Sequence, residues 1–272
     1  MTKTIVIKLG GAEGVQFDPI CQDVAELVSQ GERVVLVHGG SNEANLLGDA
    51  VGYPAKFISS PSGYTSRYTD AKTMEVFAMA VNGKINTFLV QSLQKVGVNA
   101  FGLCGLDGRL MQATRKESVK SIENGKIRLI RDDFTGKIDT VNTALLEGLF
   151  QLGLVPVVAP IAISQQSDAL NVDADRAAAM IAGALQADVL MLLTAVPGIL
   201  RNFPDPASLI AKVAYNEIDT VINLVEGRMK KKVLGAKEAL DGGVKQVIIA
   251  DGSTQNQPLV QALAGHGTMF CK

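Results

Sequence analysis

The residues best suited to chemistry lie where two apolar segments each run into a pair of glycines. IVIKLGG occupies Ile5–Gly11 and VVLVHGG occupies Val34–Gly40. Each segment is predicted to be a buried parallel strand whose C-terminal end opens into a turn without side chains. Backbone N–H groups in such a turn approach an anion closely, and the following helix adds its positive N-terminal end. With Lys8 just before the first turn, the pair predicts a phosphate or carboxylate held between adjacent strand ends.

Alternating strand and helix patterns position these turns. Beyond the two opening strands, at 5–9 and 33–38, further strands are predicted at residues 99–103, 155–159, 189–193 and 246–250. Helices are predicted at residues 17–30, 41–51, 71–81, 84–96, 140–151, 174–185, 215–225 and 229–240. Ser41 is expected to cap the second of these helices with its side chain. Hairpins are predicted at 56–68 and, around an Asn-Gly turn, within 109–138.

Composition limits the classes of protein to which the chain can belong. A length of 272 residues, with 47% hydrophobic and 19% charged residues, suits a large core shared by two fused lobes. A net charge of −1 and few aromatic residues argue against a nucleic-acid partner. We expect a cytoplasmic protein, because its three cysteines are widely spaced and form no pair typical of disulfides. A strand is predicted at the very start, which leads us to expect no signal peptide. Polar residues interrupt the most apolar stretch (177–196), so no membrane span is expected.

Two common nucleotide-binding motifs are missing, and one segment has an unusual charge. No G-x-G-x-x-G follows the first strand and no G-K-[ST] occurs, so neither a dinucleotide-binding Rossmann site nor a Walker P-loop is predicted. Residues 109–137 carry eight basic and four acidic side chains, a local charge of +4. This segment is either a solvated hairpin or a docking surface for an acidic partner.

Six motifs occur in a fixed order along nearly the whole chain. They are KLGG (8–11), HGGS (38–41), SRYTD (66–70), NVDAD (171–175), TAVPGIL (194–200) and GRMKKK (227–232). Together they resemble the amino acid kinase family in its acetylglutamate-kinase-like branch. The resemblance implies an α/β fold, a three-layer α/β/α sandwich with a mainly parallel central sheet, plus a β-hairpin-rich insertion. It also implies an N-terminal lobe (1–165) for the acyl substrate and a C-terminal lobe (166–272) for ATP.

The resemblance implies phosphoryl transfer from ATP, bound with Mg²⁺, to a side-chain carboxylate. The catalytic residues that it implies are Lys8 and Lys232, with Asp175 orienting both ammonium groups. Substrate binding is assigned in the same way to Gly40, Ser41, Arg67 and Asn171. Phosphate and ATP binding is assigned to Gly10, Gly11, Gly39, Thr194, Ala195, Val196, Pro197, Gly198, Ile199, Leu200, Met229, Lys230 and Lys231. No protein metal ligand is expected, because Mg²⁺ is held mainly through the phosphates. Ala195 departs from the aspartate or asparagine that relatives often carry.

A finer resemblance is to the subfamily of LysW-aminoadipate kinases. It rests on GGAEG (10–14), HGGS (38–41), SRYTD (66–70), LCGLDGRL (103–110), ENGKI (123–127) and DFTGKI (133–138). In that subfamily the substrate amino group is attached to the C-terminus of LysW, a small acidic carrier protein that a basic hairpin would attract. The implied reaction phosphorylates carrier-bound α-aminoadipate in lysine biosynthesis.

Three alternatives to this reaction stay open. They are an N-acetylglutamate kinase, a kinase for carrier-bound glutamate in arginine biosynthesis, and a non-catalytic metabolite sensor. A homodimer is expected, because no helix precedes the first strand as it does in the hexameric, arginine-inhibited relatives.

Overall fold

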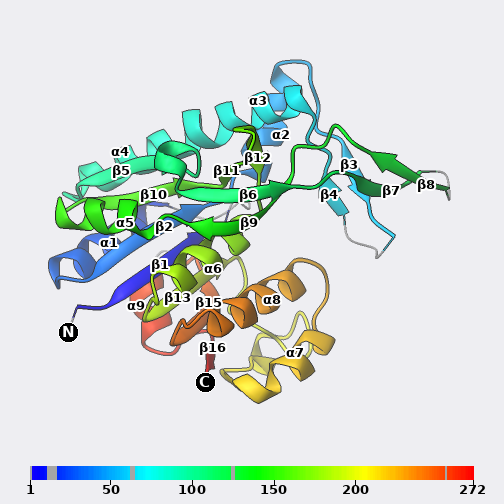
Figure 1. Ribbon diagram of the computed structural model, residues 1–272. Helices are drawn as coiled ribbons and strands as arrows, with labels where there is room; N and C mark the ends of the chain where they lie inside the picture. The colour runs from blue at the N-terminus through cyan, green and yellow to red at the C-terminus, as the bar shows by residue number, and fades with distance from the viewer. Residues whose placement is uncertain (1, 11–16, 62–64, 124–125, 255) are drawn as a thin grey trace.

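The computed structural model describes residues 2–10, 17–61, 65–123, 126–254 and 256–272, and its body is a large sheet between helices (Figure 1). The sheet has eight strands in the order β14 (Lys212–Ala214), β16 (Thr268–Cys271), β15 (Gln246–Asp251), β13 (Val189–Thr194), β1 (Thr4–Leu9), β2 (Arg33–His38), β10 (Val155–Ala159) and β5 (Ala100–Cys104). Every neighbouring pair is parallel except β15 with β16. The predicted mainly parallel sheet is therefore confirmed.

The two faces of the sheet are covered by different helices, because successive side chains of a strand point in opposite directions. Ile5, Ile7 and Leu9 pack with α1 (Phe17–Ser29), α4 (Thr87–Lys95) and α9 (Pro258–Leu263). Val6 lies in the core that includes α5 (Thr143–Gln151), α6 (Ala174–Ala184), α7 (Ile218–Leu224) and α8 (Gly227–Asp241). The predicted three-layer sandwich is thus confirmed, and Lys8 is in phase with Val6, on the face of α6 and α8.

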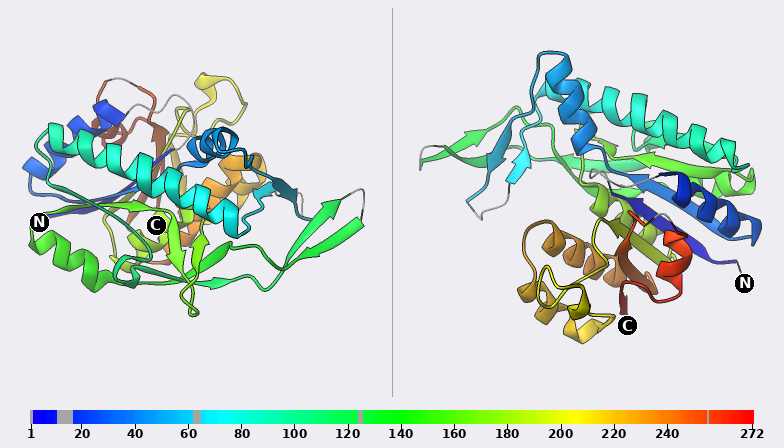
Figure 2. Two further views of the ribbon diagram at one scale, coloured as in Figure 1. Left: turned by 90° about the horizontal axis from the view of Figure 1, so that it is seen from above. Right: turned by 180° about the vertical axis from the view of Figure 1, so that it is seen from behind.

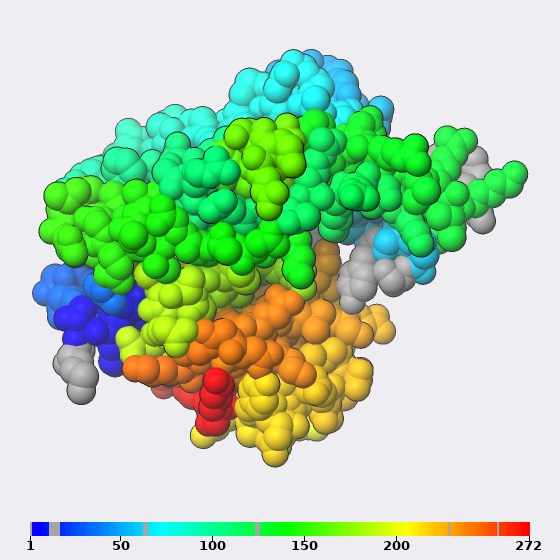
Figure 3. Space-filling model, viewed as in Figure 1, coloured from blue at the N-terminus to red at the C-terminus, as the bar shows by residue number. Residues whose placement is uncertain are grey.

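A smaller sheet and two hairpins extend this body. The sheet has the order β12 (Ala169–Asn171), β11 (Ile161–Ile163), β6 (Met111–Arg115) and β9 (Gly136–Val141). Hairpins β3 (Phe57–Ser59) with β4 (Thr65–Arg67) and β7 (Val119–Glu123) with β8 (Lys126–Ile130) confirm the two predicted hairpins. They project from the same end of the molecule in both views of Figure 2, and β7–β8 stands out from the surface in Figure 3. The Asn-Gly turn lies outside the described residues.

The predicted break between helices near residues 81–84 is wrong. α3 (Ala71–Ala78), a π-helical segment (Met79–Asn86) and α4 follow one another without interruption, because a wider helical turn absorbs the irregularity. The predicted cap of α2 (Ser41–Ala50) is also wrong: Gly40 is the N-cap, Ser41 is the first helical residue, and no side chain caps this end. None of the helices in the described part of the chain is long and apolar enough to cross a membrane.

Several short elements have no sequence signal that we recognised. The four strands of the smaller sheet, and β14, α9 and β16 at the end of the chain, were not predicted. Helix α5 begins at Thr143 rather than at residue 140, because β9 continues to Val141. The predicted helix at 215–225 divides into a 3₁₀ turn (Tyr215–Glu217) and α7; further 3₁₀ turns lie at Asp107–Arg109 and Pro206–Ser208.

Candidate active site

Two lysines from distant parts of the chain meet one aspartate at the C-terminal edge of the large sheet. Lys8 Nζ lies 2.8 Å from Asp175 Oδ1, and Lys232 Nζ lies 3.0 Å from both carboxylate oxygens of Asp175. Their side chains are only 9%, 8% and 14% exposed for Lys8, Lys232 and Asp175. The structure therefore brings together the three residues that the sequence assigned to catalysis.

Local structure explains why these side chains converge. Lys8 pairs with Leu192 of β13 on one side and Val37 of β2 on the other, so its side chain projects from a strand near the middle of the sheet. Asp175 lies in the first turn of α6, whose N-terminus is capped by the Asp173 side chain accepting from the N–H of Arg176. A carboxylate in this turn is stabilised by the positive end of the helix dipole. Lys232, in α8, completes the cluster from the opposite side.

The cluster carries a net charge of +1 and is almost completely buried from solvent. Burial by itself would raise the pKa of Asp175, but the opposite charges of Lys8 and Lys232 outweigh it and lower that pKa to about 2. The pKa of Lys232 is lowered, first by burial and then by repulsion from Lys8. A phosphate oxygen arriving here would meet two ammonium groups whose mutual repulsion a fixed carboxylate already offsets.

The C-terminal ends of β1 and β2 lie side by side, because Leu9 pairs with His38 and the Gly39 N–H donates to the Leu9 carbonyl at 3.1 Å. A Cβ on Gly40 would lie 2.6 Å from Val81 Cγ1 and 2.8 Å from Ile85 Cδ1, so a larger residue would force these side chains of the π-helical segment to shift. The second turn therefore presents backbone alone. Gly10 is buried at the end of β1, whereas the predicted Gly11 lies outside the described residues.

His38 is held as a neutral ring at the base of the second turn. The Asn86 amide donates to His38 Nε2 at 3.0 Å and to the Val157 carbonyl at 2.8 Å, while His38 Nδ1 lies 2.9 Å from the Gly39 carbonyl. The hydrogen-bond pattern assigns the ring proton to Nδ1, and both ring nitrogens are occupied. His38 is therefore a structural residue, with no free ring nitrogen to act as a catalytic base.

We expect His38 to titrate far below an ordinary histidine. Burial, assisted by the charge of Lys8 and opposed by the Gly39 hydrogen bond, lowers the pKa of His38 to about 4. Because the folded-state pKa lies below the unfolded value, His38 stabilises the fold above pH ~6.5, and this contribution is lost as pH falls towards 4. NMR titration checks this, since the chain has only one other histidine, the exposed His266. A His38 signal that titrates near pH 6.5 would contradict it.

On the other side of the second turn lie the residues predicted to bind the acyl substrate. Arg67 is 8% exposed, stacks 5.2 Å from the Phe57 ring centre, and belongs to none of the ion pairs among the described residues. Asn171 donates to Thr69 Oγ1 at 3.1 Å and is half-buried. Ser41 is exposed, and its carbonyl accepts from Arg67 Nη2 at 3.0 Å.

The predicted nucleotide loop follows β13 and divides into two parts. Thr194, Val196 and Pro197 are half-buried and Ala195 is exposed, whereas Gly198, Ile199 and Leu200 are buried. The Ile199 N–H donates to Thr268 Oγ1 at 2.8 Å and its carbonyl accepts from the Ile210 N–H, so both backbone groups already have partners. Met229, Lys230 and Lys231 lie half-buried in the first turns of α8. The accessible part of the loop is therefore 194–197.

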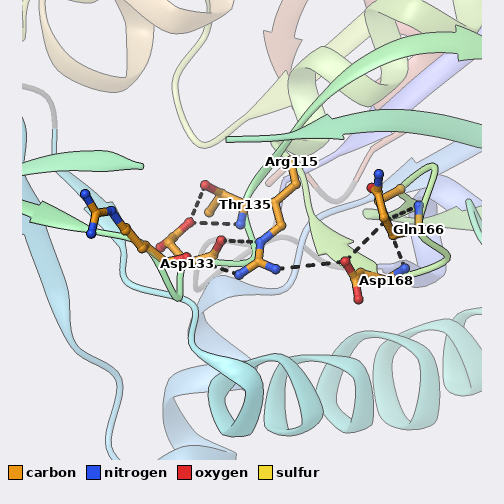
Figure 4. A network of polar contacts seen from close by, with 7 residues as sticks. Arg115, Asp133, Thr135, Gln166 and Asp168 are labelled. Atoms are coloured by element: carbon orange, nitrogen blue, oxygen red, sulfur yellow. Dashed lines mark hydrogen bonds and ion pairs between the residues drawn. The ribbon is translucent and has the colours of Figure 1, made fainter. Parts of the chain in front are cut away.

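A polar network that sequence reasoning missed lies beside the residues predicted to bind the acyl substrate (Figure 4). Buried Asp133 accepts from the N–H groups of Thr69 at 3.0 Å and Thr135 at 2.9 Å, and from the Thr135 hydroxyl. Arg115 Nε donates to the Asp133 carbonyl at 3.0 Å, and its guanidinium lies 3.7 Å from the Phe134 ring centre. The network joins the root of hairpin β7–β8 to Thr69 and, through it, to Asn171. Asp133 stood inside DFTGKI, but nothing in that motif distinguishes a buried acceptor from a surface carboxylate.

Comparison with known proteins gives relatives over nearly the full chain. A LysW-aminoadipate kinase of Deinococcus radiodurans is 50% identical over 97% of this chain and 90% of its own length. An acetylglutamate kinase of Desulfitobacterium hafniense is 37% identical over 98% and 91%. N-acetylglutamate synthase from Neisseria gonorrhoeae, solved with coenzyme A and N-acetyl-glutamate, superposes with a TM-score of 0.80 at 25% identity; the match covers 99% of this chain and 59% of that one. Residues 3–251 match the family model for amino acid kinases, and the chain belongs to the amino acid kinase family.

Proposed function

We propose that this protein transfers the γ-phosphoryl group of ATP to the side-chain carboxylate of α-aminoadipate carried by LysW, giving an acyl phosphate and ADP in lysine biosynthesis. The observation that carries the proposal is the Lys8–Asp175–Lys232 cluster beside the backbone-lined turn at Gly39–Gly40. The 50% identical relative bears the name of that activity, and the acetylglutamate kinase is more distant.

In the proposed reaction a carboxylate oxygen forms a bond to the γ-phosphorus, and the bond to the bridging oxygen breaks, leaving its electron pair on ADP. The attacking carboxylate is ionised at neutral pH, so no general base is needed. Lys8 and Lys232 would neutralise the charge on the transferring group, and Asp175 would keep both ammonium groups aimed at it. N–H groups of Gly10, Gly39 and Gly40 would hold phosphate oxygens, and accessible loop 194–197 with the start of α8 would hold the nucleotide.

Mg²⁺ is proposed to arrive on the ATP phosphates, whose oxygens are the ligands it prefers. Among the described residues, no group of three or more His, Cys, Asp or Glu side chains is arranged to hold a metal. The +1 cluster is suited to the remaining negative charge of an ATP–Mg²⁺ complex. When bound, the ion supplies further charge neutralisation on the phosphates.

The acyl substrate would extend from the glycine turn towards hairpin β3–β4. Arg67 is suited to grip the α-carboxylate, because a guanidinium forms two parallel hydrogen bonds with it. Asn171, with a half-buried amide, would contact the group at the amino end. In this proposal residues 1–165 form the acyl lobe and residues 166–272 the ATP lobe.

The carrier would dock beside the hairpins. A cavity of about 580 Å³ lies between β3–β4 and β7–β8, and its lining includes Lys56, Phe57, Tyr68, Arg128 and Arg131. Three cations against the single carboxylate of Asp132 suit an acidic partner. Electrostatic attraction by these groups would speed the association of the carrier, and the association rate would therefore fall as the salt concentration rises.

Turnover of carrier-linked aminoadipate and of free N-acetylglutamate should differ by at least about a hundredfold in kcat/KM, because only the first would use the hairpin surface. Carrier-linked glutamate tests the alternative of a kinase for carrier-bound glutamate. Because this substrate lacks one methylene, its kcat/KM is expected to be about tenfold to a hundredfold lower than that of carrier-linked aminoadipate. Raising NaCl should lower kcat/KM for the carrier-linked substrate and leave that of N-acetylglutamate nearly unchanged. A preference for free N-acetylglutamate would refute the proposal.

A cytoplasmic homodimer is proposed as the working form. Large apolar side chains are exposed on the π-helical segment, on α4 and on the edge strand β5: Met79 at 48%, Phe88 at 57% and Phe101 at 44%. An exposed edge with apolar neighbours is the kind of surface that a second copy covers. Light scattering that gives the mass of one chain would contradict the dimer.

A further inference from the structure

Arg67 is held along one edge by two neutral groups of α2. Its Nη2 donates to Asn45 Oδ1 at 2.6 Å and to the Ser41 carbonyl at 3.0 Å, and the Phe57 ring lies against its guanidinium. One nitrogen thus binds both acceptors, while Phe57 limits rotation of the plane. The guanidinium is buried, so its orientation is set by these contacts rather than by solvent.

The chemistry of the acceptor at position 45 is as important as its place. An amide oxygen orients the guanidinium without cancelling its charge, which none of the ion pairs among the described residues compensates. Burial lowers the pKa of Arg67, although an arginine stays protonated. A carboxylate at position 45 would form a strong pair with Arg67 and compete with any incoming carboxylate.

The same helix begins at the glycine turn. Gly40 is the N-cap of α2 and is wedged against Val81 and Ile85, so the start of α2 has little freedom to shift. Asn45 follows one helical turn later and fixes Arg67. A rigid unit therefore connects the backbone that would face the acceptor carboxylate with the cation that would face the α-carboxylate.

We propose that Asn45 is a positioning and specificity-determining residue: by holding Arg67 at a fixed separation from the Gly39–Gly40 turn, it sets the chain length of the dicarboxylate that is phosphorylated. The inference rests on the proposed function, in which Arg67 binds one end of the substrate and the turn lies at the other. A six-carbon and a five-carbon substrate differ in that end-to-end span by one methylene.

The test compares Asn45→Ala with Asn42→Ala, which makes the same change at an exposed position of the same helix. Loss of a hydrogen bond to a charged group predicts a KM for carrier-linked aminoadipate about tenfold higher in Asn45→Ala. Its preference for carrier-linked aminoadipate over carrier-linked glutamate should fall at least about fivefold, from the roughly tenfold to hundredfold that one methylene is expected to give the wild type. The KM for ATP and the kcat should both stay within about twofold of wild type. A variant that failed to fold would instead show a much lower kcat.

Asn45→Asp gives a second, opposite test. Because its carboxylate occupies Arg67, KM should rise about a hundredfold for both substrates, the scale of a charge-assisted pair. If Asn45→Ala leaves the KM and the chain-length preference unchanged, or if Asn42→Ala changes them equally, the assignment is wrong.

Failure of the proposed function remains distinguishable from failure of this inference. Should the wild type use free N-acetylglutamate, the same variants are assayed with N-acetylglutamate and N-acetylaminoadipate. A selective loss of chain-length preference in Asn45→Ala would then support the role of Asn45 even though the carrier is not used. An unchanged preference would overturn it with either substrate pair.

Discussion

Replacing Lys8 with methionine is expected to lower kcat about a thousandfold, the scale seen when a positioned group that stabilises transition-state charge is removed. Methionine keeps most of the side-chain volume in a site where Lys8 is nearly buried, and Asp175 keeps Lys232 as its partner. The fold should therefore persist while one of the two cations facing the transferring group is lost. Steady-state kinetics with ATP and the carrier-linked substrate, together with thermal unfolding, measures both effects.

Lys245→Met is the matched control. Lys245 also pairs with an aspartate, Asp188, but it is 72% exposed and lies at the opposite edge of the sheet. Such surface pairs contribute about 0–1 kcal/mol, so activity should stay within about twofold of wild type. Lys8→Met retaining a tenth of wild-type kcat would remove Lys8 from the proposed mechanism. Wild-type protein inactive towards every acyl substrate would favour the metabolite sensor instead.

Asp175→Asn is expected to destabilise the protein by about 3 kcal/mol at pH 7, within the range for breaking a buried charge pair. Two buried ammonium groups would then face each other without the carboxylate that separates them. Urea unfolding measures the loss. We also expect kcat to fall at least about a hundredfold, because the lysines would no longer be held in one orientation.

Two further measurements distinguish this cause from a general packing defect. The pKa of Asp175 is lowered from its ordinary value of 3.8 to about 2, so its stabilising effect is fully present above pH 3.8 and is lost as pH falls through 2. The difference in unfolding free energy between wild type and Asp175→Asn should thus be constant between about pH 5 and 7, where both lysines stay protonated. Adding Lys8→Met to Asp175→Asn should restore part of the stability, since one of the repelling charges is gone. Purely additive losses would contradict this account.

The sequence was most informative where a continuous apolar run ends in glycine. Such runs predicted β1 and β2, which are buried almost along their whole length, and the glycines after them marked their ends, so the sheet and the turns could be predicted. Lys8 stood out because it is charged within an otherwise apolar strand. Asp175 and Lys232 were assigned only through motifs, since nothing local indicates that α6 and α8 meet at β1.

Residues whose role depends on a distant partner could not be predicted. Asn45 and Asn86 are single amides in helices, and their partners Arg67 and His38 come from other elements. The smaller sheet was missed because β11 and β12 have three residues each, too few to display a period. The π-helical segment was missed because the sequence around Gly83 resembles an ordinary helix break.

The place of β1 in the sheet has a consequence for biosynthesis. One edge of β1 is covered by β2, about thirty positions later, but the other pairs Ile5 with Val189, a partner 184 positions further along. At translation rates of about 5–20 residues per second, that edge stays open for roughly 10–40 s after β1 is made. During this time the open edge of β1 offers unpaired backbone N–H and C=O groups to other chains. We therefore expect that the central position of β1, which aims Lys8, leaves the newborn chain open to mispairing until β13 has been made.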